Sequence, residues 1–431
     1  DAKGRLTEEA GMFAGLTTEE ANKPIALHLE KIGALFALKK IEHQYPHCWR
    51  CHKPVIFRAT SQWFCSVDDF KDEAVKAAED VKWFPEWGKD RLQSMVKERA
   101  DWCISRQRKW GVPIPVVYCQ DCGKEIIDND VMMKVSKIFG EEGSDAWFAH
   151  DTEYFLPKGF KCPHCGSDKG FDKEKDIMDV WFDSGSSHAA VCARRGYLKV
   201  PADVYLEGAD QYRGWFQSSL LTSVAGGNGA PYKQIITHGW TVDGEGKKMS
   251  KSLGNGIDPQ EIVGKYGADI LRLWVASADY HADIRISPEI LKQISDNYRK
   301  LRNTARYCLS NLYDFNPDSD MVSNDELEEL DKYALMKLDE VLEIARNAFE
   351  VYDYHTAAHS LHNFCVVEMS NFYFDVLKDR LYTSAPESKT RRAAQTVLYK
   401  VLDALTLILT PILAFTADEI WLAMPHDKSR N

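Results

Sequence analysis

Residues 243–255 read DGEGKKMSKSLGN, a loop with glycines near both ends and three lysines between them. Glycine gives such a loop conformational freedom. Lys247, Lys248 and Lys251 offer ammonium groups to a polyanion, and the serines add hydroxyl groups. A loop of this kind suits a triphosphate whose charge shifts during a reaction. On composition alone a solvated Lys/Gly loop is the better interpretation, and only the literal string KMSKS at residues 248–252 favours the phosphate-binding one.

Upstream of this loop, short apolar runs alternate with turn and helix signals. The runs VYL (204–206) and QIIT (234–237) each precede a polar residue and a glycine, EG in the first case and HG in the second. Short buried strands followed by helices are the pattern of a parallel α/β sheet. Ligand groups in such folds lie at the carboxyl ends of the strands, which is where these polar residues fall.

Downstream, from about residue 290, the apolar residues recur at three- and four-residue steps, which is helical periodicity. One series is Leu327, Leu330, Ala334, Leu338, Val341, Leu342, Ala345 and Phe349, and a second is Leu398, Val401, Leu402, Leu405, Ile408 and Leu409. We therefore expect an all-α bundle in this part. Near the start, residues 17–38 also predict a helix, whereas residues 55–57 (VIF) predict a strand.

Composition limits the class of protein. The chain has 431 residues, of which 44% are hydrophobic, so it can bury a sizeable core in two to four domains and is not disordered. The net charge of −11 excludes a globally basic nucleic-acid coat and leaves only local patches for RNA contact. No uninterrupted apolar run reaches the length of about 18 residues that a membrane span needs. We expect no membrane contact.

Six of the eleven cysteines occur in Cys-x-x-Cys pairs: Cys48/Cys51, Cys119/Cys122 and Cys162/Cys165. A two-residue gap lets both thiolates of a pair reach one ion, and a glycine follows each of the two later pairs. Four thiolates with no open position predict a structural zinc site, although two unrelated reduced pairs remain the alternative. The first pair has no partner pair in the chain, so its metal binding stays open. Paired cysteines without a secretory signal indicate the reducing cytosol.

Four stretches resemble a known family. KMSKS (248–252) is similar to the second signature of class I aminoacyl-tRNA synthetases. DIMDVWFDSG (176–185), YLEGADQYRGWFQ (205–217) and THGWTVDG (237–244) resemble the bacterial-type isoleucyl-tRNA synthetases within that class. The resemblance covers essentially the whole chain.

The resemblance implies an α/β plus all-α architecture. This is the second half of a Rossmann-like catalytic domain with a zinc-binding insert, followed by an α-helical anticodon-binding bundle. The implied segments are 1–46, tail of the editing insertion; 47–118, return to the catalytic domain with a basic Trp-rich segment; 119–170, zinc insert; 171–256, catalytic half with the KMSKS loop; 257–290, stem-contact region; and 291–431, truncated anticodon-binding domain. The family's first signature, His-Ile-Gly-His, and its editing pocket are absent from the sequence. We therefore expect an internal fragment that is inactive on its own.

The implied activity is ATP-dependent formation of isoleucyl-adenylate from L-isoleucine, followed by transfer of the acyl group to tRNA(Ile) in translation. ATP with magnesium would be a substrate, zinc would be structural, and the enzyme would be a cytoplasmic monomer. By resemblance Lys248 and Lys251 are catalytic, and Trp181 and Trp215 wall the amino-acid pocket. The implied ATP and adenylate contacts are Glu207, Gly208, Asp210, Gln211, His238, Gly239, Met249, Ser250 and Ser252.

Taken without the resemblance, several of these residues have simpler interpretations. The two tryptophans could be ordinary core, and His238 a satisfied buried histidine. Asp210 and Gln211 could simply begin a helix, since Asp is favoured there.

Two basic segments are candidates for tRNA contact. Residues 91–110 carry six basic and two acidic residues among tryptophans, and the resemblance directs Arg106 and Arg108 toward RNA. An internal ion-pair network is the alternative there. Arg299, Arg302 and Arg306 form one helical stripe, for which tRNA contact and a solvated face remain open.

Two other functions remain possible at this stage. A valyl-tRNA synthetase would be a relative in the same class, and an amino-acid panel in pyrophosphate exchange separates it. A non-catalytic zinc and RNA-binding module would be a protein of another class. A His-Ile-Gly-His strand in the upstream reading frame supports the enzyme over the module.

Overall fold

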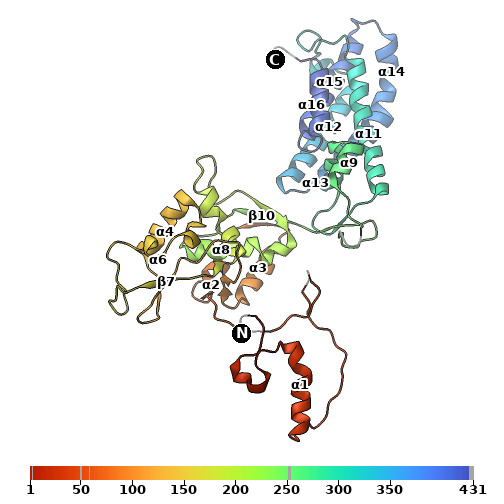
Figure 1. The fold of residues 1–431 in the computed structure, drawn as a ribbon. Helices are drawn as coiled ribbons and strands as arrows, with labels where there is room; N and C mark the ends of the chain where they lie inside the picture. Colours follow the sequence, from red (N-terminus) through yellow and green to blue (C-terminus); the bar gives the residue numbers. More distant parts are fainter. Residues whose placement is uncertain (2, 49–50, 58, 251–253, 427–431) are drawn as a thin grey trace. The chain divides into compact units, whose positions relative to one another are not determined.

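The computed structural model describes residues 1, 3–48, 51–57, 59–250 and 254–426. The chain divides into two units, one of Asp1–Cys65 with Cys103–Ile177 and one of Ser66–Trp102 with Met178–Asn431, and many of the helices and strands named below are labelled in Figure 1. Each unit is therefore built from two separate stretches of sequence. Four short strands lie at or close to the points where the sequence passes from one unit to the other. They are β1 (Phe64–Cys65), β3 (Trp102–Cys103), β4 (Ser105–Arg106) and β8 (Ile177–Met178).

The first unit begins with the 3-10 helix η1 (Glu8–Phe13) and the helix α1 (Thr18–Lys31). Thr17 starts α1 in a capping box, since its hydroxyl accepts from Glu20 N at 3.2 Å and the Glu20 carboxylate accepts from Thr17 N at 2.8 Å. The helix ends at Lys31, and Gly33 follows with φ +72°. The helix expected over residues 17–38 is therefore too long, because the chain turns at this glycine.

The strand expected over residues 55–57 is wrong. These residues have no regular structure, and only an isolated bridge between His47 and Pro54 occurs beside them. Val55 N does donate to Pro46 O at 3.1 Å. One such bond does not make a strand, because a strand needs a neighbour that continues the ladder.

The rest of the first unit contains a small antiparallel sheet of order β6 (Glu125–Ile126), β5 (Val117–Cys119), β7 (Phe171–Lys173). Three helices follow β6: α4 (Asn129–Glu142), α5 (Ala146–Ala149) and α6 (Thr152–Phe155). Their buried core is Val117, Ile126, Val131, Val135, Ile138, Trp147, Phe155 and Phe171. The core is small, which matters for the cysteine site at the end of this sheet.

The second unit contains a parallel sheet of order β2 (Lys82–Phe84), β10 (Gln234–His238), β9 (Tyr205–Gly208). The central strand β10 buries Ile235, Ile236 and Thr237, as a strand covered on both faces requires. The helices of this region are α2 (Lys71–Ala77), α3 (Gly88–Lys97), α7 (Val180–Gly185) and α8 (Trp215–Ala225), with the short helices η2 (His188–Cys192) and η3 (Ala209–Arg213). The predicted parallel α/β arrangement is confirmed.

Strand β11 (Thr241–Val242) pairs in parallel with β12 (Ile284–Arg285). Two helices lie between these strands in the sequence, and the regular structure after β12 is entirely helical. The helices are α9 (Pro259–Tyr266), α10 (Ala268–Ser277), α11 (Pro288–Asn311), η4 (Asn324–Glu326), α12 (Glu329–Glu350), α13 (Tyr354–Asn363), η5 (Phe364–Tyr373), α14 (Phe374–Thr383), α15 (Lys389–Leu409) and α16 (Ala414–Ala423). The expected all-α part is confirmed. Among the described helices, none combines the length and the apolarity that crossing a bilayer requires.

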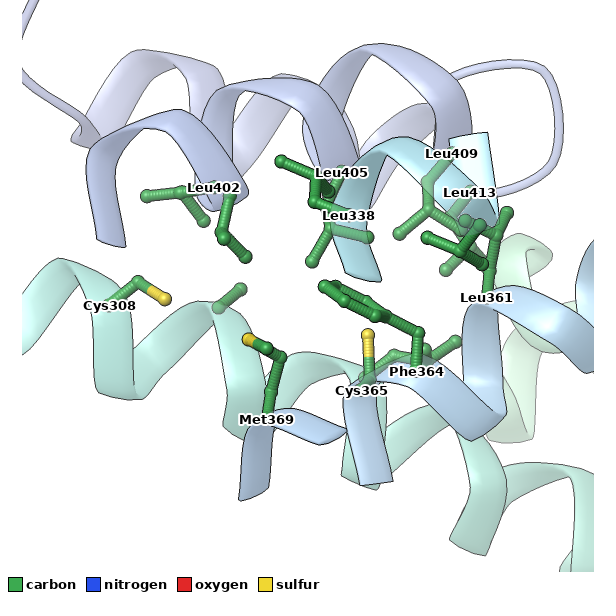
Figure 2. Close-up of a cluster of buried hydrophobic side chains, with 14 of the residues drawn as sticks. Cys308, Leu338, Leu361, Phe364, Cys365, Met369, Leu402, Leu405, Leu409 and Leu413 are labelled. Carbon is green, nitrogen blue, oxygen red and sulfur yellow. The ribbon is translucent and has the colours of Figure 1, made fainter. Parts of the chain in front are cut away.

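The bundle core explains the helical periodicity in the sequence. In Figure 2, Leu338 of α12 and Leu405 of α15 lie over Phe364, Leu402 lies toward Cys308 and Met369, and all of them are buried. Each fully buried leucine contributes about 1.5–3 kcal/mol relative to an exposed one. The apolar residues spaced three and four apart therefore lie on the side of each helix that faces this core.

Candidate functional site

The carboxyl edge of the parallel sheet brings two predicted groups together. In the register of β9 and β10, Thr237 lies opposite Glu207 and His238 lies opposite Gly208. The Glu207 side chain is exposed, and His238 is half-buried with Nδ1 at 2.8 Å from the carbonyl oxygen of Gly239. That bond fixes the imidazole ring at the strand end. Glu207 and His238 therefore lie at neighbouring strand ends, one residue apart in the register, so their side chains emerge on opposite faces of the edge where parallel sheets present ligand groups.

Gln211 ties the edge of the sheet to helix α8. Its Oε1 accepts from the backbone N of Trp215 at 2.9 Å, and its Nε2 donates to Asp210 Oδ2 at 3.0 Å. Gln211 therefore satisfies a free N–H at the start of α8 and also holds the exposed Asp210 carboxylate. A helix-capping role and a ligand role are compatible here, because Asp210 keeps its other oxygen free of Gln211.

An aromatic wall continues from the same point. Trp215 stacks on Tyr205 with ring centroids 3.9 Å apart and planes at 7°. Its indole Nε1 donates to Ser184 O at 3.0 Å and to Ser187 Oγ at 3.2 Å. The indole is therefore fixed in position and its polar group is satisfied, which leaves apolar surface for a ligand.

Gly214 brings the second tryptophan to this wall. A Cβ at Gly214 would lie 2.8 Å from Cη2 of Trp181 and 2.4 Å from Oε1 of Gln211. The Trp181 indole therefore rests directly on the backbone beside Trp215, and 40% of its surface is exposed. The structure thus places the two predicted pocket tryptophans next to each other.

Gly214→Ala is expected to displace Trp181 and Gln211, because neither 2.4 Å nor 2.8 Å is compatible with a methyl group. For the adenylate formation that the resemblance implies, the KM of the full gene product for the amino acid should rise about tenfold or more, since even one methylene of apolar pocket contact is worth about 1–3 kcal/mol. Steady-state pyrophosphate exchange measures it. Gly229→Ala is the control, because a Cβ there meets nothing within 4 Å. An unchanged KM in Gly214→Ala would contradict the packing described here.

A buried network behind the wall was not predicted from the sequence. Trp102 Nε1 donates to Asp179 Oδ2 at 3.0 Å, and Asp179 Oδ1 accepts from the backbone N of Trp181 at 3.2 Å. Arg99 lies over the Trp102 ring at 5.1 Å and donates to Gln217 Oε1 at 2.5 Å. These residues come from three distant parts of the sequence, so no local signal indicated the network.

One carboxyl group in this region is electrostatically unusual. Burial, with a smaller contribution from the nearby Asp179 carboxylate, raises the pKa of Asp183 to about 6. Asp183 lies one turn after Asp179 on α7. A carboxyl group with this pKa changes charge close to neutral pH, next to the tryptophan wall.

The glycine- and lysine-rich loop begins as a hairpin after β11. Val242 bridges to Lys248, Asp243 N donates to Lys247 O at 2.9 Å, and Gly246 turns the chain with φ +84°. The Lys248 ammonium lies 5.3 Å from the centroid of the Trp240 ring. Met249 packs against the helical core. The predicted Lys251 and Ser252 lie outside the described residues.

Two side chains link the ends of this loop. The Asn255 amide donates to Asp243 Oδ2 at 2.9 Å and to Lys248 O at 3.2 Å, and its Oδ1 accepts from Ser250 N at 2.9 Å. The hydrogen bond from Asn255, followed by that from Lys247 N, lowers the pKa of the Asp243 carboxyl below its usual range. Asp243 therefore carries a full negative charge at neutral pH.

The basic segment 91–110 divides between the two alternatives. Arg91 lies over the Trp87 and Tyr212 rings, and Arg99 over Trp102, so both are internal contacts. Arg106 Nη1 donates to the carbonyl oxygens of Cys103 and Ser105 at 2.7 Å each. Arg108 is exposed. Internal contacts therefore account for three of the six cations of this segment, whereas Lys97, Arg108 and Lys109 are exposed.

The arginine stripe of α11 is also largely paired. Arg299 donates to Asp296 at 2.6 Å, and Arg302 makes a bidentate pair with Glu419 at 2.7 and 2.5 Å. Arg306 is exposed and lines, with Arg302, a cavity of about 250 Å³ that also includes Glu419 and Ile420. The stripe exists, but acidic neighbours neutralise two of its three charges.

The second and third cysteine pairs come together. Cys119 Sγ lies 3.7 Å from Cys165 Sγ, Cys122 Sγ lies 3.7 Å from Cys162 Sγ, and all four sulfur atoms lie within 4.8 Å of one another. Four thiolates at about 2.3 Å from one tetrahedral zinc stand about 3.8 Å apart, so the arrangement fits zinc. In the described part of the chain, this is the one group of three or more metal-capable side chains.

The same backbone turn forms both halves of this site. Gly123 N donates to Cys119 O and Gly166 N donates to Cys162 O, each at 2.8 Å. Both glycines have positive φ, +69° and +75°, which a residue with a Cβ adopts at a cost. The glycine that follows each of these cysteine pairs therefore allows the positive φ that the turn requires.

The described residues around the first cysteine pair make a similar hydrogen bond. His52 N donates to Cys48 O at 2.8 Å, and Cys48 N donates to Lys53 O at 2.8 Å. His52 occupies the positive-φ position, at +56°, that glycine occupies in the other two turns. Cys48 and Cys51 do not belong to the four-cysteine group. Their metal binding stays open.

Two families of known proteins match this chain. Residues 13–287 match the family described as tRNA synthetases class I (I, L, M and V). Residues 331–430 match the family described as the anticodon-binding domain of tRNA ligase. The two matches together cover the sheet, the cysteine site, the lysine loop and most of the helical part.

Curated relatives agree with these matches. An isoleucine–tRNA ligase of Caldicellulosiruptor bescii is 60% identical over 98% of this chain and 46% of its own length. That of Thermoanaerobacter sp. (strain X514) is 58% identical over the whole chain and 46% of its own length. The chain thus spans about half the length of these relatives.

Solved structures show the same fold at lower identity. A Mycobacterium tuberculosis methionyl-tRNA synthetase in complex with methionyl-adenylate has a TM-score of 0.62 at 21% identity, over 87% of this chain and 65% of that one. A ternary complex of Agrobacterium radiobacter K84 LeuRS with tRNA and LeuAMS has a TM-score of 0.56 at 22% identity, over 76% of this chain and 41% of that one.

Proposed function

The chain belongs to the class I tRNA synthetases of the isoleucine, leucine, methionine and valine group, and on that premise we propose that its full gene product is an isoleucine–tRNA ligase. The reaction is ATP-dependent formation of isoleucyl-adenylate and transfer of the isoleucyl group to tRNA(Ile). The observation that carries the choice of amino acid is the 58–60% identity to isoleucine–tRNA ligases along essentially the whole chain.

The edge of the parallel sheet is the proposed adenylate site. Glu207 and Asp210 are exposed carboxylates that can accept from the substrate ammonium and from ribose hydroxyls. His238 with Gly239 lies at the adjacent strand end, suited to contact the nucleotide, and Gln211 holds Asp210 in place. Gly208 allows the substrate to approach the strand end closely.

The lysine loop is the proposed phosphate-stabilising element. Attack of the isoleucine carboxylate on the α-phosphate of ATP develops negative charge on phosphate oxygens, and Lys248 with Lys251 supplies positive charge there. Magnesium, which arrives with ATP, neutralises part of the same charge. Met249, Ser250 and Ser252 shape the loop and contact the nucleotide.

Trp181 and Trp215 are the proposed walls of the isoleucine side-chain pocket. Their fixed indole faces offer apolar contact area with few polar groups to satisfy. Such a pocket cannot reject valine strongly. One methylene is worth about 1–3 kcal/mol, a general value for which isoleucyl-tRNA synthetases are themselves the standard example.

The four cysteines Cys119, Cys122, Cys162 and Cys165 are proposed to hold a structural zinc ion. Their sulfur spacing supports this, and four protein ligands leave no position open for a substrate. The ion would fix the two knuckles of the insert without taking part in the chemical steps.

The proposed tRNA contacts rest on exposed cations. Arg108 is exposed beside Trp110, whose side chain is 93% exposed, and this pair suits the phosphate and the base of a single-stranded RNA end. Arg306 is the arginine of the α11 stripe best placed for a phosphate. Arg106, Arg299 and Arg302 would first have to exchange the partners described above.

Pyrophosphate exchange with the full gene product tests the proposal. Isoleucine should give the highest kcat/KM of the twenty amino acids, and valine should fall about 10–200-fold below it. A higher kcat/KM for valine would identify a valine enzyme instead. Absence of exchange with every amino acid, in a protein that still binds zinc and tRNA, would favour the non-catalytic module.

A further inference from the structure

The hydrogen bonds between Asp243 and Asn255 join the two ends of the lysine loop. Asp243 Oδ2 accepts from Asn255 Nδ2 at 2.9 Å, and its other oxygen accepts from the backbone N–H groups of Lys247 at 2.8 Å and Glu245 at 3.0 Å. Asn255 Oδ1 accepts from Ser250 N, and its Nδ2 also donates to Lys248 O. The Asn255 amide thus contacts Asp243 at the start of the loop, Lys248 with the proposed catalytic ammonium, and Ser250.

The chemistry of these partners determines which side chain fits position 255. Ser250 N–H can only donate, so it requires an oxygen, whereas Asp243 Oδ2 and Lys248 O can only accept, so they require an N–H. An amide supplies both, in a single orientation. A carboxylate at this position would place two negative oxygens against each other, since Asp243 is ionised at neutral pH.

We propose that Asp243 and Asn255 are positioning residues for adenylate formation, acting as a clasp that fixes the backbone of Lys248. The inference rests on the proposed function, because the lysine matters only if the loop acts on a triphosphate. The clasp holds the backbone of Lys248 while its ammonium rests against the exposed Trp240 ring. A contact of that strength, about 0.5–1 kcal/mol, leaves the side chain free to move to the phosphates. The clasp thus lowers the entropic cost of aligning the ammonium.

Exchanging the two side chains tests the clasp in the full gene product. Asn255→Asp alone should lower kcat for pyrophosphate exchange about tenfold or more, because it sets two carboxylates side by side and removes the donor to Lys248 O. Asp243→Asn alone should also lower it. The double variant restores a donor on residue 243 and an acceptor on residue 255, and still offers an oxygen to Ser250 N. Its kcat should exceed that of Asn255→Asp, so the two effects are non-additive, but it should stay below wild type because Lys248 O still lacks its donor.

Two further readouts separate positioning from damage to the fold. The KM for isoleucine and the melting temperature should stay near the wild-type values in all three variants, because none of the hydrogen bonds of the clasp given above involves Trp181 or Trp215 and because residues 244–248 of the turn are exposed. Glu245→Gln is the matched control. It removes the exposed Lys247–Glu245 pair at 2.7 Å and leaves the side-chain clasp intact, so its kcat should match wild type.

The outcomes are distinguishable. A double variant whose loss equals the product of the two single losses overturns the clasp, as does an Asn255→Asp enzyme with wild-type kcat. A parallel rise in the KM for isoleucine also overturns it, because that result would mean general disruption. Wild-type exchange activity is measured first, so failure of the proposed function is recognised independently of failure of the clasp.

Discussion

Cys162→Ser in the full gene product is expected to lose one equivalent of zinc and the folded structure of the insert. Zinc held by four thiolates contributes binding free energy of about 10–16 kcal/mol at neutral pH, and in a small domain that energy is folding energy. The core beside the site is small, so it cannot replace the missing ion. Elemental analysis gives the zinc content, and limited proteolysis should show new cleavage within residues 119–170.

Cys192→Ser is the matched control for this prediction. Cys192 is half-buried in η2 of the second unit and does not belong to the four-cysteine group. Its replacement should leave zinc content and proteolysis unchanged. A Cys162→Ser protein that keeps its zinc, or that loses zinc and still resists cleavage within the insert, would contradict a structural role for the ion.

The sequence predicted the helical part best because that signal is long and repeated. Leu338, Val341, Leu342 and Ala345 all face the core of the bundle, as their spacing indicates. A short element has too few residues for its spacing pattern to repeat, so its sequence signal is weaker. The run VIF at 55–57 has strand-forming residues, but a strand requires a partner that the sequence pattern does not reveal.

The same limit applies to the candidate site. Glu207 and His238 were predicted at strand ends because each follows a short apolar run, and the register of β9 and β10 places them at neighbouring strand ends, one residue apart. Long-range partners could not be predicted in this way. Glu419 neutralises Arg302 from 117 residues away, so a helical stripe that reads as a basic surface is largely paired. The Trp102–Asp179 bond spans 77 residues and was equally invisible.

The clasp shows what a resemblance leaves unexplained. Family likeness directs attention to the lysines of the loop, whereas the hydrogen bonds show which residues hold their backbone. Asn255 lies beyond the family's second signature and has no charge, so nothing in its residue type marked it as functional. Its role emerged only from the three partners that its amide satisfies together.

Lys248→Ala is expected to reduce kcat for isoleucine-dependent pyrophosphate exchange by about 10²–10³. This is the usual loss when one preorganised donor to a charged transition state is removed. In the reaction proposed for the full gene product, the ammonium acts on charge that develops only as the α-phosphate is attacked, so the KM for isoleucine should change little. Lys248 is exposed and its contact with Trp240 is worth about 0.5–1 kcal/mol, so the melting temperature should move little.

Lys247→Ala provides the neighbouring comparison, with the same charge removed one residue earlier. The Lys247 ammonium pairs with Glu245 within the turn, both side chains are exposed, and the backbone N–H that binds Asp243 is retained in the variant. Its kcat should therefore stay within about threefold of wild type, since exposed pairs contribute about 0–1 kcal/mol. If both variants lose activity equally, the loop acts through its summed charge rather than through a positioned Lys248. If Lys248→Ala retains full activity, Lys248 does not stabilise the transition state, and the clasp loses its purpose with it.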